Sequence, residues 1–231
     1  MGIMGPTSRE LLAGLTADDV SNTALPYYRS KELQIGYAKV RANRLSYVGE
    51  LGYELYMPTE FALHIFEEIL HTGAAFNLTL AGYHAMNSCR IEKGYRHFGH
   101  DIGDETTPLE AGLGFAVDMG KSDFIGKAAL EAQFKPLTKR LVNIALRDNN
   151  PTLIYHDEPI YSGNDLVGMT TSGAWGYRID RSIGIASISL PQGITKASLA
   201  ATPLEIEVAG RRHPIDAQLA PFYDPKSERM K

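Results

Sequence analysis

Alternating apolar and polar residues form several short stretches in the first half of the chain, a pattern typical of strands with one buried face. Other stretches carry apolar residues at helical spacing. The predicted strands span residues 33–40, 44–48, 53–57 and 113–117, and the predicted helices span 6–15, 58–73, 82–91 and 125–132. Thr7 or Ser8 is placed to cap the first helix, and Gly73 suits the end of the second. This order predicts an α+β unit with helices on one face of a mainly antiparallel sheet.

The opening helix is predicted to begin with no preceding strand, an unusual start for a domain that we interpret as the mark of a fragment. The pattern changes between Pro136 and Arg140, so we place one domain at 1–137 and a second at 138–231. The second part has short apolar stretches separated by turn residues, and no long helix. Six strands are predicted there, at 141–146, 159–161, 166–169, 183–188, 204–208 and 215–219. Strands of this length and spacing favour a small β-barrel or sandwich.

The charge balance and the cysteine content exclude several classes of protein. The chain of 231 residues has 23 Lys and Arg against 27 Asp and Glu, so no basic excess is present for binding nucleic acid. No stretch approaches the roughly 20 apolar residues of a membrane span, and the first residues lack the layout of a signal peptide. Cys89 has no partner for an internal disulfide and is interpreted as a small buried side chain. These features predict a cytoplasmic protein that binds neither nucleic acid nor membranes.

Several common chemistries have no motif in this sequence. It contains no glycine-rich nucleotide loop and no Gly-x-Ser-x-Gly nucleophile elbow. His97, His100 and Asp101 bring two imidazoles and a carboxylate close together. A metal site needs further ligands fixed elsewhere, and none stands out. We therefore predict an ordinary loop there and no metal.

The segment 44–56 has the most informative pattern. Two glycines form a tight turn between two predicted strands, with Tyr47 before the turn and Glu54 after it. We expect these two residues to lie near each other on adjacent strands. The carboxylate would then accept paired N–H donors from an aminopyrimidine-like ring, while the tyrosine covers the ring face. An exposed glutamate on a plain hairpin explains the same pattern equally well, and the residues alone leave both interpretations open.

Residues 46–55 resemble the GYTGE-x-G-x-E signature of the glycine-cleavage T-protein (aminomethyltransferase) family. Further family motifs follow in the same order along the chain, at 87–94, 107–113 with 124–127, and 168–173. The segments 46–56, 90–97 and 221–225 are most similar to the C-terminal half of dimethylglycine and sarcosine dehydrogenases. The resemblance covers about residues 6 to 225, and four motifs in order are far more specific than any one of them.

The resemblance implies a ferredoxin-like folate-binding subdomain, an antiparallel sheet with helices, followed by a small six-stranded β-barrel. It also implies that Tyr47 and Glu54 lie in the folate pocket with Glu54 bonding the pterin, and that Phe115 lies against the folate. The implied cofactor is tetrahydrofolate, which captures a one-carbon unit from an N-methyl amine as 5,10-methylenetetrahydrofolate. FAD would belong to a flavin domain or subunit that is not part of this chain and would act as its partner.

Two departures from the family pattern stand out. Met86 occupies the position of an arginine that helps to hold folate in T-proteins. The family's catalytic aspartate, with much of the first folate-binding subdomain, precedes the segment that Pro6 begins, so no catalytic residue is assigned and the chain alone is expected to be weak or inactive. Two alternatives remain: a non-catalytic module that binds folate or stabilises a flavin subunit, and a demethylase of the same fold acting on a methylated sulfur compound.

Overall fold

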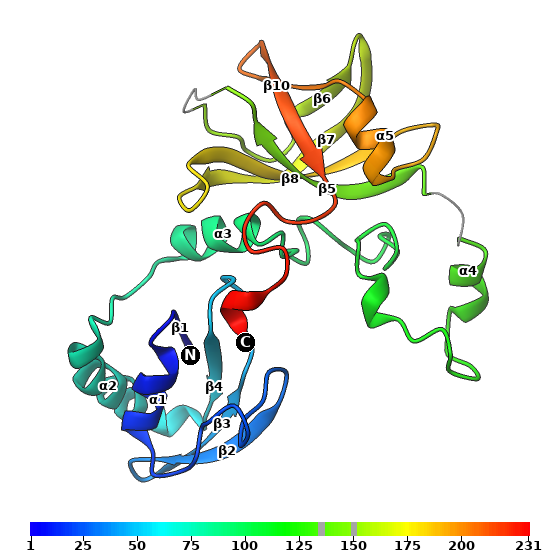
Figure 1. The fold of residues 1–231 in the computed structure, drawn as a ribbon. Helices are drawn as coiled ribbons and strands as arrows, with labels where there is room; N and C mark the ends of the chain where they lie inside the picture. The colour runs from blue at the N-terminus through cyan, green and yellow to red at the C-terminus, as the bar shows by residue number, and fades with distance from the viewer. Residues whose placement is uncertain (134–136, 149–151) are drawn as a thin grey trace. The chain divides into compact units, whose positions relative to one another are not determined.

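The computed structural model describes residues 1–133, 137–148 and 152–231 (Figure 1). These residues form two compact units, and each is described by itself. The first, which we call the sheet unit, consists of Met1–Met86 and Lys226–Lys231; the second, the barrel unit, consists of Asn87–Pro225. The predicted domain boundary between residues 137 and 138 stays a prediction, and Pro136 falls outside the described residues.

The sheet unit contains a four-stranded antiparallel sheet with helices, as the sequence predicts. Its strands lie in the order β1-β4-β3-β2, and each neighbouring pair is antiparallel. The elements in chain order are β1 (Gly2–Met4), α1 (Ser8–Leu15), β2 (Ser30–Ile35), β3 (Ala38–Asn43), β4 (Gly52–Tyr56), η1 (Thr59–Phe61), α2 (Ala62–Gly73) and η2 (Ala74–Phe76). Helix α3 (Tyr83–Glu92) spans the division between the units, and the short helix η4 (Glu228–Met230) closes the chain.

A single apolar core lies on one face of this sheet. Ala38, Val40 and Ala42 alternate along β3 with exposed or half-buried polar residues, and all three are fully buried. They share their core with Leu12 of α1 and Ile65 of α2. Because successive side chains of a strand point to opposite faces, the other face of the sheet is left to polar side chains.

The predicted strand at 33–40 is wrong, because the chain reverses in its middle. Ile35 pairs with Ala38, which leaves a two-residue turn between β2 and β3. Gly36 supplies a φ of +54° there, the left-handed conformation that tight hairpin turns require. A Cβ atom at this position would also lie 2.2 Å from the Nε2 atom of His64. The apolar alternation continues through both strands, which hides the turn from a pattern search.

Three other local predictions in the first half are wrong. Residues 44–48 do not form a strand: the backbone of Arg44 bonds to residues 28 and 29, which precede β2, and the chain after Arg44 is irregular. Residues 113–117 contain the 3-10 helix η3 (Gly114–Ala116), closed by local hydrogen bonds such as that from Ala116 N to Leu113 O. A short strand, β1, does precede the first helix and pairs with β4.

The predicted helices are confirmed, although their caps differ in detail. Thr7 is the N-cap of α1 but makes no side-chain capping bond. Gly73 ends α2 in a right-handed conformation, and the chain continues through η2 to Asn77, which adopts the left-handed conformation with a φ of +54°. The predicted helix at 125–132 appears as α4 (Lys127–Glu131).

The barrel unit confirms the predicted six strands and closes them into an antiparallel barrel in the order β10-β5-β8-β7-β6-β9. The strands are β5 (Lys139–Leu146), β6 (Pro159–Ser162), β7 (Asp165–Gly176), β8 (Arg181–Ser189), β9 (Leu204–Val208) and β10 (Arg211–Gln218). Strand β7 is longer than predicted and carries a bulge between Thr170 and Ser172. The short helix α5 (Lys196–Ala201) was not predicted, although Thr195 and Ser198 form a capping box at its start.

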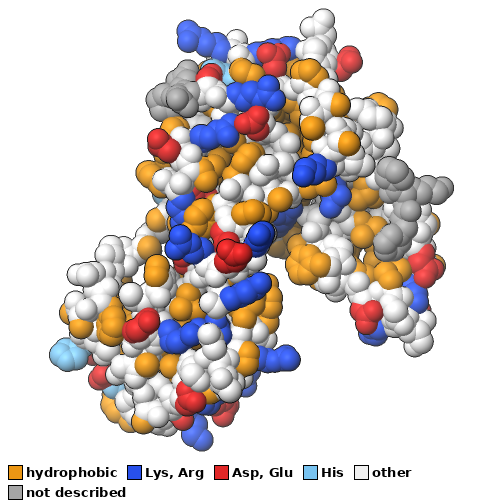
Figure 2. All heavy atoms as spheres, viewed as in Figure 1, with side chains coloured by type: hydrophobic (Ala, Val, Ile, Leu, Met, Phe, Trp, Pro, Cys, Tyr) orange, Lys and Arg blue, Asp and Glu red, His pale blue; other side chains and the backbone are white. Residues whose placement is uncertain are grey.

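The surface carries charges of both signs. Figure 2 shows Lys and Arg side chains interspersed with Asp and Glu side chains on the face in view, without one extended basic area. Among the described residues, no helix is both long enough and apolar enough to cross a membrane.

Candidate functional site

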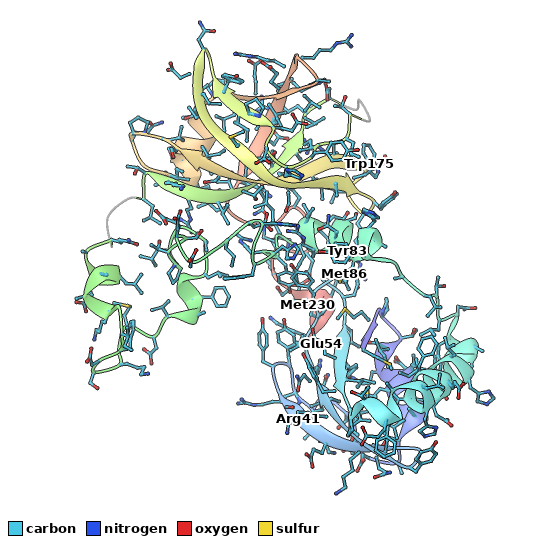
Figure 3. All side chains as sticks on the ribbon, turned by 180° about the vertical axis from the view of Figure 1, so that it is seen from behind. Arg41, Glu54, Tyr83, Met86, Trp175 and Met230 are labelled. Atoms are coloured by element: carbon cyan, nitrogen blue, oxygen red, sulfur yellow. The ribbon has the colours of Figure 1, made fainter. Side chains whose placement is uncertain are left out.

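The polar face of the sheet unit carries the best candidate site, and Glu54 lies on it. On β4, Tyr53 and Leu55 are buried in the core, with exposed fractions of 0% and 1%. Glu54 and Tyr56 alternate with them and therefore lie on the opposite face. Figure 3 shows Glu54 on β4 and Arg41 on the neighbouring strand β3.

Glu54 is partly engaged within its own strand. The Tyr56 hydroxyl donates a hydrogen bond of 2.7 Å to Oε2 of Glu54. This bond and the negative charge of Glu54 raise the pKa of the Tyr56 hydroxyl above its ordinary value of 10.0. An ionised carboxylate offers about four acceptor positions, so Glu54 keeps capacity for further donors.

The strand register places further polar side chains around this pair. Asn43 of β3 lies opposite Glu54, and Arg41 lies opposite Tyr56. Ser30 of β2 donates a hydrogen bond of 2.6 Å from its hydroxyl to Oδ1 of Asn43. The polar face thus holds a carboxylate, a phenol, an amide and a guanidinium on adjacent strands, a set that can both accept and donate hydrogen bonds.

A hollow of about 490 Å³ lies beside these residues on the sheet unit. Its volume is within the range of about 300–1,000 Å³ that small-molecule sites usually occupy. The lining residues come from β2, β3, the end of β4 and the turn after it: Glu32, Lys39, Val40, Arg41, Asn43, Tyr56, Met57 and Pro58. The hollow and Glu54 are connected through Tyr56, which lines the first and bonds to the second.

The structure places the other residues that the sequence singles out in separate segments, outside β4. Tyr47 is half-buried in the irregular segment that follows β3, so the prediction that it sits on a strand adjacent to that of Glu54 is wrong. Phe115 lies in η3 of the barrel unit and is 83% exposed. Met86, at the position of the family's arginine, is half-buried on α3. Their roles in binding stay predictions.

Sequence reasoning missed Arg41, Asn43 and Tyr56 as members of one surface. Tyr56 follows Glu54 by two residues, so strand periodicity alone places both on one face. Arg41 and Asn43 required the pairing of β3 with β4, which the wrong strand prediction at 44–48 concealed.

The barrel unit contains a second polar cluster, centred on Asp101, whose side chain is fully buried. Oδ2 of this carboxylate accepts hydrogen bonds from the Arg90 guanidinium and from the backbone N–H of His97. Oδ1 accepts from the hydroxyls of Thr171, at 2.5 Å, and Ser172, at 2.7 Å. Arg90 also bonds to Ser172, at 2.6 Å. The Asp101 carboxylate is buried and both of its oxygens already accept hydrogen bonds. This cluster therefore stabilises the fold rather than forming an open binding site.

This cluster shows how the segment with His97, His100 and Asp101 is held in the fold. Asp101 is committed to Arg90 of α3 and to β7, while the rings of His97 and His100 meet edge to face at a centroid distance of 4.5 Å. Among the described residues, no group of three or more His, Cys, Asp or Glu side chains is arranged to hold a metal ion. Cys89 is half-buried on α3, less enclosed than predicted.

Two further family-like segments meet within the barrel unit. The Lys93 ammonium donates to the backbone oxygen of Asp224 and, at 3.0 Å, to its carboxylate. The guanidinium of Arg178 lies 4.5 Å from the ring centroid of Tyr223 and pairs with Glu92 at 3.3 Å. The segment 221–225 is therefore fastened to the end of α3 and to the turn after β7.

Comparisons with known proteins agree on one family. The family profile described as "GCVT N-terminal domain" matches residues 1–121, and that described as "Glycine cleavage T-protein C-terminal barrel domain" matches residues 139–224. The chain is 40% identical to 4-methylaminobutanoate oxidase (formaldehyde-forming) of Paenarthrobacter nicotinovorans, covering 100% of this chain and 27% of that protein. It is 35% identical to the mitochondrial dimethylglycine dehydrogenase of Homo sapiens, covering 93% of this chain and 24% of that protein.

A solved structure shows the same fold. The glycine cleavage system aminomethyltransferase T from Bartonella henselae superposes with a TM-score of 0.80 at 24% identity, covering 98% of this chain and 59% of that chain. The chain thus spans about a quarter of the length of the curated relatives named above.

Proposed function

The chain belongs to the glycine cleavage T-protein family, and we propose that it binds tetrahydrofolate through the polar face of its sheet unit. The observation that carries this proposal is the Glu54–Tyr56 pair beside the 490 Å³ hollow. We propose further that the domain serves a larger enzyme that removes a one-carbon unit from an N-methyl amine. The relation to dimethylglycine dehydrogenase and 4-methylaminobutanoate oxidase supports this substrate class.

The chemistry of the pterin ring fits the free acceptor capacity of Glu54. The ring presents an exocyclic amino group and an adjacent ring N–H in one plane. A carboxylate accepts two such donors side by side, as it does from arginine. Glu54 would bond to this edge while Tyr56 holds the orientation of its carboxylate. Tyr47 and Phe115 would supply aromatic faces for the ligand.

Tetrahydrofolate supplies amine nitrogens that take up an electrophilic carbon and carry it as 5,10-methylenetetrahydrofolate. The residues of this chain would bind and orient the ring. The bound ring would exclude water from the polar face. The electrophilic carbon would come from oxidation of the N-methyl amine by a flavin domain or subunit. We propose that this chain alone gives weak or no turnover.

Calorimetric titration of the purified chain with tetrahydrofolate tests the proposal. Glu54→Gln keeps the size of the side chain but removes its charge, and a hydrogen bond to a charged group contributes about 1.5–3 kcal/mol. We therefore expect the affinity to fall by about 10- to 150-fold. Glu10→Gln is the matched control, because Glu10 is an exposed residue of α1. Unchanged affinity in Glu54→Gln, or no binding by the unmodified chain, would overturn the proposal.

The same titration, paired with a turnover assay, separates the enzyme from a non-catalytic module. We propose binding without turnover by this chain alone. Folate-dependent release of one-carbon product by the purified chain alone would contradict that expectation. Residence in the cytoplasm stays a prediction, which fractionation of cells with detection of the native protein would test.

A further inference from the structure

We propose that Arg41 and Lys39 form a second subsite on the same face, which binds the carboxylates of the glutamate tail of folate. This inference rests on the proposed function and names the part of the ligand that each side chain would recognise. Arg41 and Lys39 both line the hollow beside Tyr56. Both side chains are exposed on β3, so neither belongs to the apolar core of the sheet unit. Neither belongs to the buried ion pairs of the barrel unit.

The strand register sets the distance between the two subsites. Asn43, Arg41 and Lys39 are alternate residues of β3 on its polar face. Asn43 lies opposite Glu54. Lys39 and Asn43 are four steps apart along β3, and an antiparallel strand rises about 3.4 Å per residue, so the face extends about 14 Å from the Glu54 row to the Lys39 row. A ligand bound by its ring at Glu54 would reach Lys39 only if it carried an extended tail, which would pass Arg41 in the row between them.

The chemistry along this row changes in the order that the parts of folate require. Glu54 accepts hydrogen bonds at one end, which suits the N–H edge of the pterin. Tyr56, a residue that is 56% exposed, stands in the next row beside Arg41 and offers an aromatic surface for the benzoyl ring. Arg41, in the same row as Tyr56, and Lys39, in the row beyond it, present donors on the side away from Glu54, and an arginine binds a carboxylate with two parallel hydrogen bonds.

The two cations are available for a ligand. Within the described residues, no ion pair involves the side chain of Arg41 or that of Lys39, and both are exposed. Glu32 lies directly opposite Arg41 on β2 and also lines the hollow, yet it does not approach the guanidinium within ion-pair distance. Glu32 would repel a ligand carboxylate, so it gives the proposal a variant of opposite expected sign.

Three ligands separate the two subsites. Tetrahydrofolate carries both ring and tail, 6-methyltetrahydropterin carries only the ring, and 4-aminobenzoylglutamate carries only the tail. Their affinities are measured by calorimetry, with NMR titration for the tail fragment. An exposed charge pair contributes up to about 1 kcal/mol, so Arg41→Gln and Lys39→Gln should each weaken tetrahydrofolate binding by about fivefold. Neither should change the affinity for 6-methyltetrahydropterin.

Glu32→Gln should strengthen tetrahydrofolate binding by a few-fold and leave the ring ligand unaffected, because it removes a repulsive charge from the tail subsite. All of these effects should diminish at high salt, which screens exposed charges. The matched controls are Arg211→Gln and Lys196→Gln, exposed cations of β10 and α5 in the barrel unit.

The outcomes distinguish this inference from the proposed function. If Glu54→Gln abolishes binding of the ring ligand but Arg41→Gln and Lys39→Gln leave tetrahydrofolate binding unchanged, the tail subsite is refuted and the pterin site stands. Equal weakening of ring and full ligand by those variants also refutes the tail subsite. If only the tail fragment binds, and Arg41→Gln weakens it, the tail subsite stands without the pterin site. If none of the three ligands binds, both are wrong.

Discussion

Asp101→Asn is the substitution that tests most directly what holds the barrel unit together. It removes one negative charge and keeps the size and shape of the side chain. The carboxylate pairs with Arg90, whose side chain is 2% exposed, so the guanidinium would be left in the interior without its counter-charge. One of the two oxygens also becomes an amide nitrogen, which cannot accept from the donors that surround it.

The expected magnitude follows from burial. Removing one partner of a buried ion pair costs about 3–5 kcal/mol, because the remaining charge is uncompensated in a region of low polarity. A total unfolding free energy of about 5–15 kcal/mol makes this a large fraction of the stability. For a domain of about 150–250 residues, each kcal/mol lowers the melting temperature by about 2–4 °C, so Asp101→Asn should lower it by about 6–20 °C.

Thermal and urea unfolding followed by circular dichroism measure the loss. The control is Asp165→Asn, which makes the same chemical change at an exposed position at the start of β7 and should alter the stability by less than about 0.5 kcal/mol. Arg90→Met and the double variant complete the cycle, in which the second substitution should cost much less once the first has been made. A loss below about 1 kcal/mol in Asp101→Asn, or full additivity in the cycle, would refute the reasoning.

Two further predictions concern close packing and pH. Gly173→Ala should destabilise the protein by about 1–3 kcal/mol in urea unfolding, because its Cβ would lie 2.0 Å from the backbone oxygen of Ile154. The control Gly82→Ala has open space around it and should leave the stability unchanged. Equal stabilities of the two variants would contradict the packing argument. The pKa of the Tyr56 hydroxyl, raised by its hydrogen bond to Glu54, should fall in Glu54→Gln when ionisation is followed by NMR of the tyrosine ring. A raised pKa means that the contact stabilises the fold below the ordinary pKa of tyrosine, and that this contribution is lost as the pH rises through the raised value. An unchanged pKa in the variant would rule out the contact.

The barrel was the most predictable part of the fold. Each of its six strands is a short apolar segment bounded by turn residues, so local pattern was sufficient. The bounds of β7 were underestimated because its second half includes Gly173 and Gly176, residues that weaken a strand prediction. These glycines are needed where Ile154, Ile183 and Glu92 approach the backbone closely, which is a tertiary requirement.

The sheet unit was predicted in outline and missed in detail. The uninterrupted alternation across residues 33–40 reflects two strands facing the same core, so a turn between them leaves no break in the pattern. Only Gly36 marked the reversal, and a single glycine also occurs within strands. Residues 44–48 have the composition of a strand, but no strand lies beside them for pairing.

The predicted site residues illustrate the same division. The sequence predicted Glu54 as a site residue because its surrounding motif resembles a family signature, and it predicted Phe115 by the same route. It did not connect Glu54 with Arg41, because that link runs through the register between β3 and β4. Nor did it connect Asp101 with Arg90, because recognising a motif in the sequence gives no distance between its side chains and those of another segment.

What the sequence by itself determined is therefore the outline: the main helices, the six strands of the barrel, and the family to which the motifs belong. These properties depend on local periodicity and on residue identity in order. What only the tertiary structure decided is which side chains share a surface or a buried cluster. Strand register places Glu54, Tyr56 and Arg41 on one polar face, and packing of α3 against β7 buries Arg90 with Asp101, because both arrangements arise from contacts between residues far apart in the chain.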